Sequence, residues 1–293
     1  MPFLRRSGPL DAASVALRSV LETPTFELIP TKGALAETAH LPAGSAVAVT
    51  SSPRSGIEGT LELTEQLESA GFRAIPHLAA RMVHDRAHLR DVLDRLAAAG
   101  ADRAFVVAGD APNHGKYSDG LTLLREMAEI GQLPSEIGIP CYPQGHAFIA
   151  DERLLDALRA KAPFASYMTT QLCFDPAAIT SFVAARRAEG IELPVHVGVP
   201  GVAKPQRLLS ISARIGVRDT HRFVAKNTRF VGRMIRSGGF YSPDDLLEDL
   251  GPHLSDPVAA IVGLHFYTFN AVKQTEDWRR RYVARFSADV AVP

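Results

Sequence analysis

Short apolar runs alternate with amphipathic stretches along the whole chain. Eight of these runs predict strands, at residues 26–29, 46–50, 73–78, 104–109, 137–142, 166–172, 195–200 and 263–269. Several runs are apolar at consecutive positions, which is typical of parallel strands covered on both faces. The alternation therefore predicts an α/β fold in which helical crossovers link the strands.

Three of the intervening stretches carry clear helix boundaries. The helical patterns over 56–71 and 87–100 both finish on a glycine, the residue favoured just past a helix end. The segment 175–190 begins with Asp175 as a predicted N-cap and has Pro176 at its first helical position. These stretches are therefore predicted to be helices that connect successive strands.

Eight strands with intervening helices in 293 residues fit a (β/α)₈ TIM barrel. The alternative is an open doubly wound sheet, which is expected to have a glycine-rich turn after its first strand, and residues 26–33 contain no G-x-G-x-x-G. A helix is expected at about 10–22, and extra helices are expected in 217–258, which is longer than a standard crossover. Because no Ser-, Gly- or Pro-rich linker interrupts the pattern, residues 1–293 are predicted to form one barrel domain.

Composition narrows the class of protein. Apolar residues make up 46% of the chain and charged residues 22%, as in soluble globular proteins. Because 32 basic residues balance 32 acidic ones and no apolar run could span a bilayer, neither nucleic acid nor a membrane is an expected partner. Cys141 and Cys173 lie in apolar segments and are expected to be reduced core thiols of a cytoplasmic protein. The run Arg279–Arg281 is expected on a solvated helix face, and oligomeric state is left open.

Polar residues follow or end most of the predicted strands. In a TIM barrel the carboxyl ends of the strands meet at one mouth, where the functional groups gather. His265 and Tyr267, at the last strand, are expected to have a structural role. The polar residues at the predicted strand ends are Glu27, Thr50, His77, Asp110, Tyr142, His146, Gln171, His265 and Tyr267.

Six short motifs carry a resemblance to a known family. The motifs "FELIP", "PHL", "GDAP", "YPQGH", "TTQLCFD" and "HFYTFN" together resemble the methylenetetrahydrofolate reductase family, in order and in spacing, over residues 26–271. The resemblance implies a TIM barrel that reduces 5,10-methylenetetrahydrofolate to 5-methyltetrahydrofolate. It also implies NADH or NADPH as reductant, usually acting through bound FAD.

The resemblance implies roles for individual residues. Glu27 would supply the proton that opens the imidazolidine ring of the substrate, and the negative charge of Asp110 would stabilise the resulting cation. Gln171 would hydrogen-bond the pterin edge, and Gln206 would also contact the substrate. Contacts with the cofactor are implied for Thr50, His77, Gly109, Tyr142, His146 and Arg159, and no metal is expected.

Each of these positions also has a structural interpretation. Glu27 could be a solvated edge carboxylate, and Gln171 could satisfy backbone groups at a strand end. Asp110 could form a turn or cap the next helix, although Asp119 stands nearer to that helix. His77 could be a packed polar residue at the end of its strand.

The chain departs from the family pattern where the family binds the FAD diphosphate. The family has an arginine where this chain has Ala108. The segment 154–160 matches a basic family segment, but only Arg159 is retained, while Asp156 and Ala160 replace an asparagine and a lysine. Each lost charge-assisted hydrogen bond weakens binding by roughly 1.5–3 kcal/mol, so tight binding of FAD is doubtful. The sequence therefore predicts direct hydride transfer from NADH or NADPH to the folate.

Three alternatives stay open at this stage. The chain could be an FAD-dependent reductase with rebuilt diphosphate contacts, or a folate-binding protein without turnover. Another one-carbon or methyl-transfer barrel is a more distant alternative, which the absence of metal and corrinoid motifs disfavours. No motif distinguishes NADH from NADPH.

Overall fold

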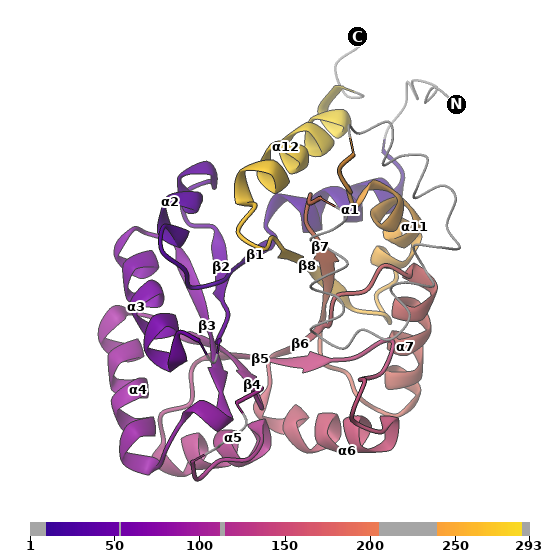
Figure 1. Cartoon of the computed structure of the whole chain (residues 1–293). Coiled ribbons are helices and arrows are strands. Elements are labelled where there is room, and N and C mark those ends of the chain that lie inside the picture. The colour runs from indigo at the N-terminus through magenta and orange to yellow at the C-terminus, as the bar shows by residue number, and fades with distance from the viewer. Residues whose placement is uncertain (1–9, 53, 112–114, 205–238, 289–293) are drawn as a thin grey trace.

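The computed structural model describes residues 10–52, 54–111, 115–204 and 239–288, and shows a closed barrel of eight parallel strands (Figure 1). Each strand pairs with the next one in the chain, and β8 pairs with β1 to close the ring. The predicted TIM barrel is therefore confirmed, and each predicted strand is present with its ends shifted by at most two residues. The strands are β1 (Thr25–Leu28), β2 (Ala46–Val49), β3 (Arg73–Ala79), β4 (Arg103–Val107), β5 (Glu136–Cys141), β6 (Tyr167–Thr170), β7 (Val195–Pro200) and β8 (Ile261–Tyr267).

Helices surround the barrel and connect its strands (Figure 1). Near the seam between β8 and β1, the N-terminal helix packs against both helices that flank β8 in the chain. The helices are α1 (Ala12–Glu22), α2 (Ala34–Glu37), α3 (Gly56–Ser69), α4 (Arg86–Ala99), α5 (Gly120–Ile130), α6 (Asp151–Lys161), α7 (Pro176–Ala188), α11 (Asp244–Leu254) and α12 (Val272–Ala288). The predicted N-terminal helix corresponds to α1, and α11 lies in the long region where extra helices are expected.

Local sequence signals set the helix ends. Asp175 accepts hydrogen bonds from the backbone N–H groups of Ala177 and Ala178, which confirms it as the N-cap of α7. Gly100 ends α4 in the left-handed conformation, with φ of 80°. Asp119 caps α5, because its carboxylate accepts from the backbone N–H of Thr122 at 3.0 Å.

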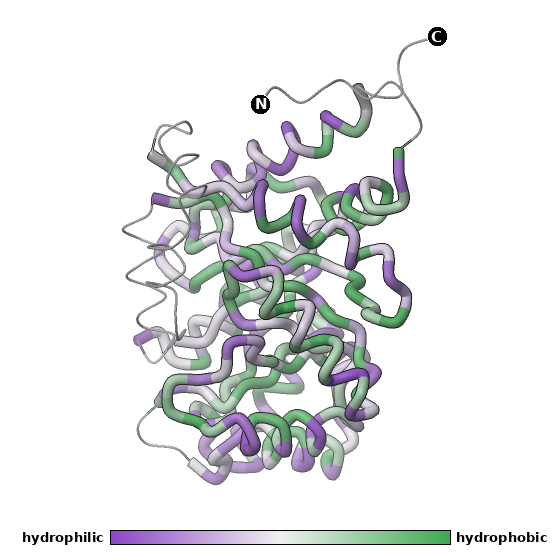
Figure 2. Tube along the Cα trace, turned by 90° about the vertical axis from the view of Figure 1, so that its right-hand side faces the viewer, coloured by the Kyte–Doolittle hydropathy of each residue, from purple (hydrophilic) through white to green (hydrophobic). Residues whose placement is uncertain are grey.

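Alternate side chains of each strand face either the helices or the barrel interior. The set that faces the helices is largely apolar, whereas the interior set mixes apolar side chains with polar ones such as Glu27, His77 and His265. Figure 2 shows the hydrophobic parts of the trace gathered toward the inside of the molecule. Inside the barrel, Ile75, Phe105 and Tyr167 form a cluster of their own. Gly138 makes room there, because a Cβ atom at this position would lie 2.5 Å from the Tyr167 ring. The lower part of the barrel is therefore a packed core that supports the mouth above it.

Side chains that follow β8 fasten it to β1. Asn270 accepts a hydrogen bond from the backbone N–H of Ile29 at 2.8 Å and donates to the carbonyl of the same residue at 3.0 Å. The Thr268 hydroxyl donates to the backbone carbonyl of Glu27. Asn270 adopts φ of 60°, a left-handed conformation that asparagine tolerates better than most residues. These contacts fix the height of Glu27 in the barrel.

The structure bears out the expectation of a solvated face for Arg280 and Arg281, which are exposed, and corrects it for Arg279. Arg279 is 8% exposed, and it donates two hydrogen bonds to Glu276, at 2.6 and 2.8 Å. Arg279 also donates to the carbonyl of Leu21, so it ties α12 to α1. At Arg279 the helix therefore holds a buried ion pair, because an acidic residue three positions earlier neutralises the arginine.

Candidate functional site

Glu27, His77 and His265 meet inside the mouth of the barrel. They come from β1, β3 and β8, and all three are buried, with exposures of 7%, 9% and 5%. The Glu27 Oε2 atom lies 3.3 Å from Nε2 of His265 and 4.0 Å from Nε2 of His77. The structure thus places the predicted proton donor between two imidazoles, and the interpretation of Glu27 as a solvated edge carboxylate is wrong.

The surroundings of Glu27 favour a group that can carry a proton. Burial lowers the pKa of His77 to about 4, more than the nearby carboxylate raises it, so His77 is neutral at pH 7. Its Nε2 atom has no hydrogen-bond partner among the residues described. In this same part of the chain, no Lys or Arg pairs with the Glu27 carboxyl group. In the described residues, the Glu27 carboxyl group therefore meets imidazoles rather than ammonium or guanidinium groups.

Asp110 follows β4 at the barrel mouth and is exposed. The preceding Gly109 has φ of 84°, and a Cβ atom there would lie 2.8 Å from the Cβ of Ala79 in β3. Only glycine allows the chain to turn at this close approach. Because Asp119 caps α5, the cap interpretation of Asp110 is wrong, and no described residue forms a hydrogen bond or ion pair with its carboxylate.

Two aromatic side chains follow β5. The rings of Tyr142 and His146 meet edge to face with their centroids 5.4 Å apart. Burial raises the pKa of Tyr142 to about 12, and the neighbouring Cys141 and Asp110 contribute to the same rise. The Tyr142 hydroxyl therefore stays protonated at neutral pH.

Thr50 and Gln171 lie directly after β2 and β6. The Thr50 carbonyl accepts a hydrogen bond from the Thr60 hydroxyl at 3.1 Å. The Gln171 side-chain carbonyl accepts from the backbone N–H of Leu172 at 2.9 Å, and its NH₂ group has no hydrogen-bond partner among the described residues. Gln171 thus satisfies the backbone, as its structural interpretation holds, and keeps an unused donor.

The remaining predicted residues are not brought to this cluster. Arg159, in the last turn of α6, has its guanidinium 4.0 Å from the Glu189 carboxylate at the end of α7. Ala108 and Asp156 are exposed, and neither supplies a cation. Gln206 lies outside the described residues.

Sequence reasoning missed the contact between His265 and Glu27. The signal lay in "HFYTFN", where His265 and Tyr267 are two residues apart and so face the same side of the strand. Tyr267 donates its hydroxyl to the backbone carbonyl of Thr170 at 3.0 Å, so its structural role is confirmed. His265 instead contacts the candidate proton donor.

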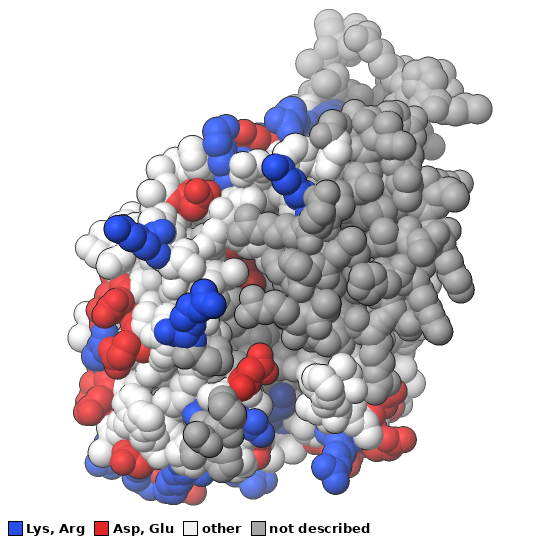
Figure 3. Space-filling model, in the orientation of Figure 1, with Lys and Arg blue, Asp and Glu red and all other residues white. Residues whose placement is uncertain are grey.

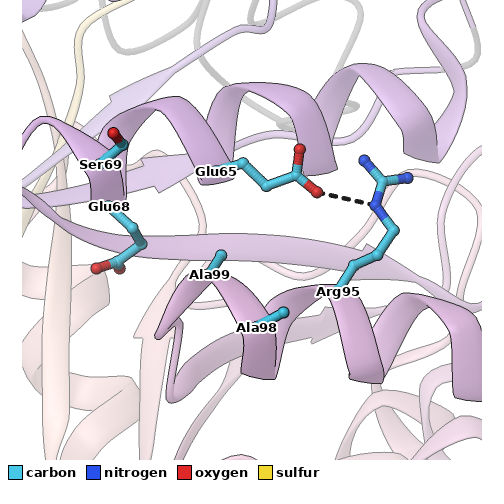
Figure 4. Close-up of a pocket in the computed structure, with 6 residues that line it drawn as sticks. All are labelled: Glu65, Glu68, Ser69, Arg95, Ala98 and Ala99. Atoms are coloured by element: carbon cyan, nitrogen blue, oxygen red, sulfur yellow. Dashed lines mark hydrogen bonds and ion pairs between the residues drawn. The ribbon is translucent and has the colours of Figure 1, made fainter.

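Two other features of the surface are less suited to catalysis than the cluster around Glu27. A hollow between α3 and α4 is lined by residues of both helices, and in Figure 4 Glu65 and Arg95 point toward each other across it, 2.8 Å apart. No candidate residue lines this hollow. Figure 3 shows acidic and basic side chains mixed over the coloured part of the mouth face, with no basic patch there.

The described residues also limit other kinds of site. Within them, no three His, Cys, Asp or Glu side chains form a group that could hold a metal ion. Cys141 and Cys173 are free and buried, as expected. The helices of the described ranges include none that is long and apolar enough to cross a membrane.

Comparison with known proteins gives one family. The family model described as methylenetetrahydrofolate reductase matches residues 32–218, which include His77, Asp110 and Gln171 but not Glu27 or β8. Two solved structures from Burkholderia cenocepacia J2315 are also similar. One, a putative lyase/mutase, is 14% identical with a TM-score of 0.44 and covers 95% of this chain and 87% of its own. The other, a putative phosphonomutase, is 17% identical with a TM-score of 0.41, and the match covers 77% of this chain and 98% of the phosphonomutase chain.

Proposed function

Because this chain belongs to the methylenetetrahydrofolate reductase family, we propose that it reduces 5,10-methylenetetrahydrofolate to 5-methyltetrahydrofolate by direct hydride transfer from NADH or NADPH. The observation that carries the proposal is the burial of Glu27 beside two imidazoles at the mouth. A carboxyl group without a cation partner in such a site is suited to donate a proton.

Glu27 is proposed as the general acid. The substrate ring opens when N10 leaves as a protonated amine, and this step generates an iminium cation at N5. The Oε2 atom of Glu27 faces the histidines, and no hydrogen bond reaches Oε1 from the residues that the structure describes. Oε1 is therefore the oxygen that can hold a proton toward the substrate.

Asp110 and Gln171 are proposed to bind and orient the pterin. The exposed Asp110 carboxylate follows β4 and supplies negative charge where the iminium cation forms. The free NH₂ group of Gln171 can donate to an acceptor on the pterin edge. Gln206 stays a predicted substrate contact.

The residues present do not fit tight binding of FAD. Of the positions that match the family's diphosphate-binding segment, Arg159 alone is basic, and its guanidinium lies 4.0 Å from the carboxylate of Glu189, which Arg186 contacts at 2.8 Å. Asp156 places a carboxylate on the same exposed helix face, and Ala108 replaces the other expected cation. A diphosphate there would meet repulsion instead of charge-assisted hydrogen bonds.

A nicotinamide nucleotide is the proposed reductant, and it supplies hydride when bound. Thr50, His77, Gly109, Tyr142 and His146 are its proposed contacts, with Arg159 retained as a prediction. The unpaired Nε2 atom of His77 supports a polar ligand in this region. The task of these residues is to hold donor and acceptor in contact, since direct transfer requires both to be bound together.

The test uses flavin-stripped protein and reductant deuterated at the transferring C4 position. Direct transfer predicts turnover without added FAD, sequential kinetics, and full retention of deuterium in the product methyl group. A flavin-dependent reductase would need FAD and would lose label, because the hydrogen on reduced flavin N5 exchanges with water. Such a result would overturn direct transfer but keep the reductase. A protein that binds folate without any turnover would contradict the proposed function as a whole.

A further inference from the structure

We infer that His265 is a positioning residue for Glu27: it donates from Nε2 to Oε2, so that Oε1 carries the transferable proton, and it stabilises the carboxylate left after transfer. This inference rests on the proposed function and deepens it. It gives a role in the reaction to His265, which is expected from the sequence to be structural.

The two histidines contact Glu27 unequally. Nε2 of His265 lies 3.3 Å from Oε2, close to hydrogen-bond length, whereas Nε2 of His77 lies 4.0 Å away. Residues Thr25 and His265 are direct partners in the pairing of β1 with β8, so His265 lies beside the strand that carries Glu27. His265 therefore fixes the position of the Glu27 carboxyl group. The Nε2 atom of His77 has no hydrogen-bond partner among the described residues, so it can contact a ligand.

The groups that face His265 do not compete for this role. The ring of Tyr267 lies 4.9 Å away, and its hydroxyl is engaged with β6. Burial lowers the pKa of His77 and of His196 to about 4 in each case, so both are neutral at pH 7. Glu27 is the acidic group within contact of the His265 ring.

The proton and the electrons balance in the proposed step. The Oε1–H bond of Glu27 breaks and an N10–H bond forms, while the bond between N10 and the methylene carbon breaks with its electron pair staying on N10. Glu27 becomes a carboxylate, and the hydrogen bond from His265 becomes charge-assisted and stronger. The hydride from NADH or NADPH then adds to the iminium carbon, and Glu27 regains a proton from water.

The test compares His265→Leu with His265→Gln. Leucine removes the donor. At pH values below the alkaline limb of the profile, kcat should therefore fall about 10- to 100-fold, while KM for folate stays within about 3-fold of the wild-type value. The acid then becomes harder to ionise, so the alkaline limb of the kcat profile should move to higher pH. Glutamine restores an N–H donor and should return kcat and the profile to near wild type.

His196→Gln is the matched control. His196 lies in the same interior and stacks on Tyr167 at 4.4 Å between centroids. Its substitution should leave the pH profile unchanged. If the pH profile of kcat does not shift in His265→Leu, or if His265→Gln does not restore kcat, the inference about His265 is overturned. Turnover by the wild-type protein would still support the proposed function.

A measurement without turnover separates the two proposals. In ¹⁵N-histidine NMR spectra, the signal lost in His265→Leu identifies His265, and this signal should shift in Glu27→Gln. If wild type is inactive but the shift is seen, the hydrogen-bonded pair stands and the proposed reductase fails. If the signal does not respond to Glu27→Gln, the pair itself is refuted.

Discussion

Two buried glutamates in this protein have opposite surroundings. Glu276, in α12, is 1% exposed and accepts hydrogen bonds from Arg279 at 2.6 and 2.8 Å and from Arg280 at 2.7 Å. Glu27, in β1, is 7% exposed and contacts imidazoles at 3.3 and 4.0 Å. Both oxygens of Glu276 are occupied by cations, whereas Glu27 has a single imidazole hydrogen-bonded to one oxygen.

The difference shows how burial alone fails to define a role. Two guanidinium groups bind both oxygens of Glu276, and the same arginines connect α12 to the rest of the fold. Glu27 has no such partner in the described part of the chain and contacts imidazoles alone. The comparison separates a carboxylate built for stability from one suited to chemistry.

The largest expected effect is that of Glu27→Gln. The amide keeps the shape of the side chain but has no proton to give, so kcat should fall about 10²- to 10⁴-fold. Folate affinity and the thermal midpoint should stay near wild type, because no ion pair is broken. Steady-state kinetics and folate titration of the same preparation check this. Substantial residual turnover would remove Glu27 from the role of general acid.

Glu276→Gln should show the reverse. It leaves the buried Arg279 charge uncompensated, so the free energy of unfolding should drop by about 3–5 kcal/mol. The kcat of the folded fraction should change little, since α12 lies outside the mouth. Urea unfolding followed by circular dichroism measures the loss. A stable variant with impaired turnover would contradict the division between the two glutamates.

Acid should destabilise the barrel through its interior histidines. Because burial lowers the pKa of His77 and of His196 to about 4, the unfolded chain binds protons below pH 6.5 that the folded chain does not. Stability should therefore be full above pH 6.5 and fall toward pH 4, by on the order of 2–3 kcal/mol for each histidine.

Unfolding free energies measured between pH 7 and pH 4.5 test this expectation. In His77→Gln the slope over that range should be reduced, because one of the two groups no longer titrates. A slope equal to that of wild type would show that His77 is not buried in its neutral form.

The smallest effect comes from two aspartates near β4. Asp119→Ala removes the N-cap of α5 and should cost about 1 kcal/mol of stability with turnover unchanged. Asp110→Asn should lower kcat about 10-fold or more, with stability within about 0.5 kcal/mol of wild type. Chemical unfolding and kinetics on both variants check the pair. Equal effects on stability would return Asp110 to a structural role.

The alternation of apolar runs was sufficient to predict the barrel. Each strand can be recognised from its own residues, because they must be apolar to fill the space between the barrel and the helices. Helix ends were predictable for the same reason, because capping by Asp175 depends on residues two and three positions away. Strand ends shifted by up to two residues, because pairing with the neighbouring strand decides where a strand stops.

The environment of the site was less accessible from sequence. His265 and Glu27 are 238 positions apart and meet only because the barrel closes between β8 and β1. The burial of Arg279 was missed because a run of arginines resembles a surface unless its acidic partner is known to be buried too. The ion pair of Arg159 with Glu189 likewise depends on how α6 and α7 pack.

The clasp that Asn270 and Thr268 form on β1 has a consequence for how the protein is made. Glu27 leaves the ribosome early, yet the residues that hold it in place are synthesised about 240 positions later. Contacts of such long range form slowly, so β1 remains an unpaired edge until the final strand arrives. A chain cut short before Thr268 would already contain Glu27, the proposed proton donor, but would lack the contacts that hold it in place.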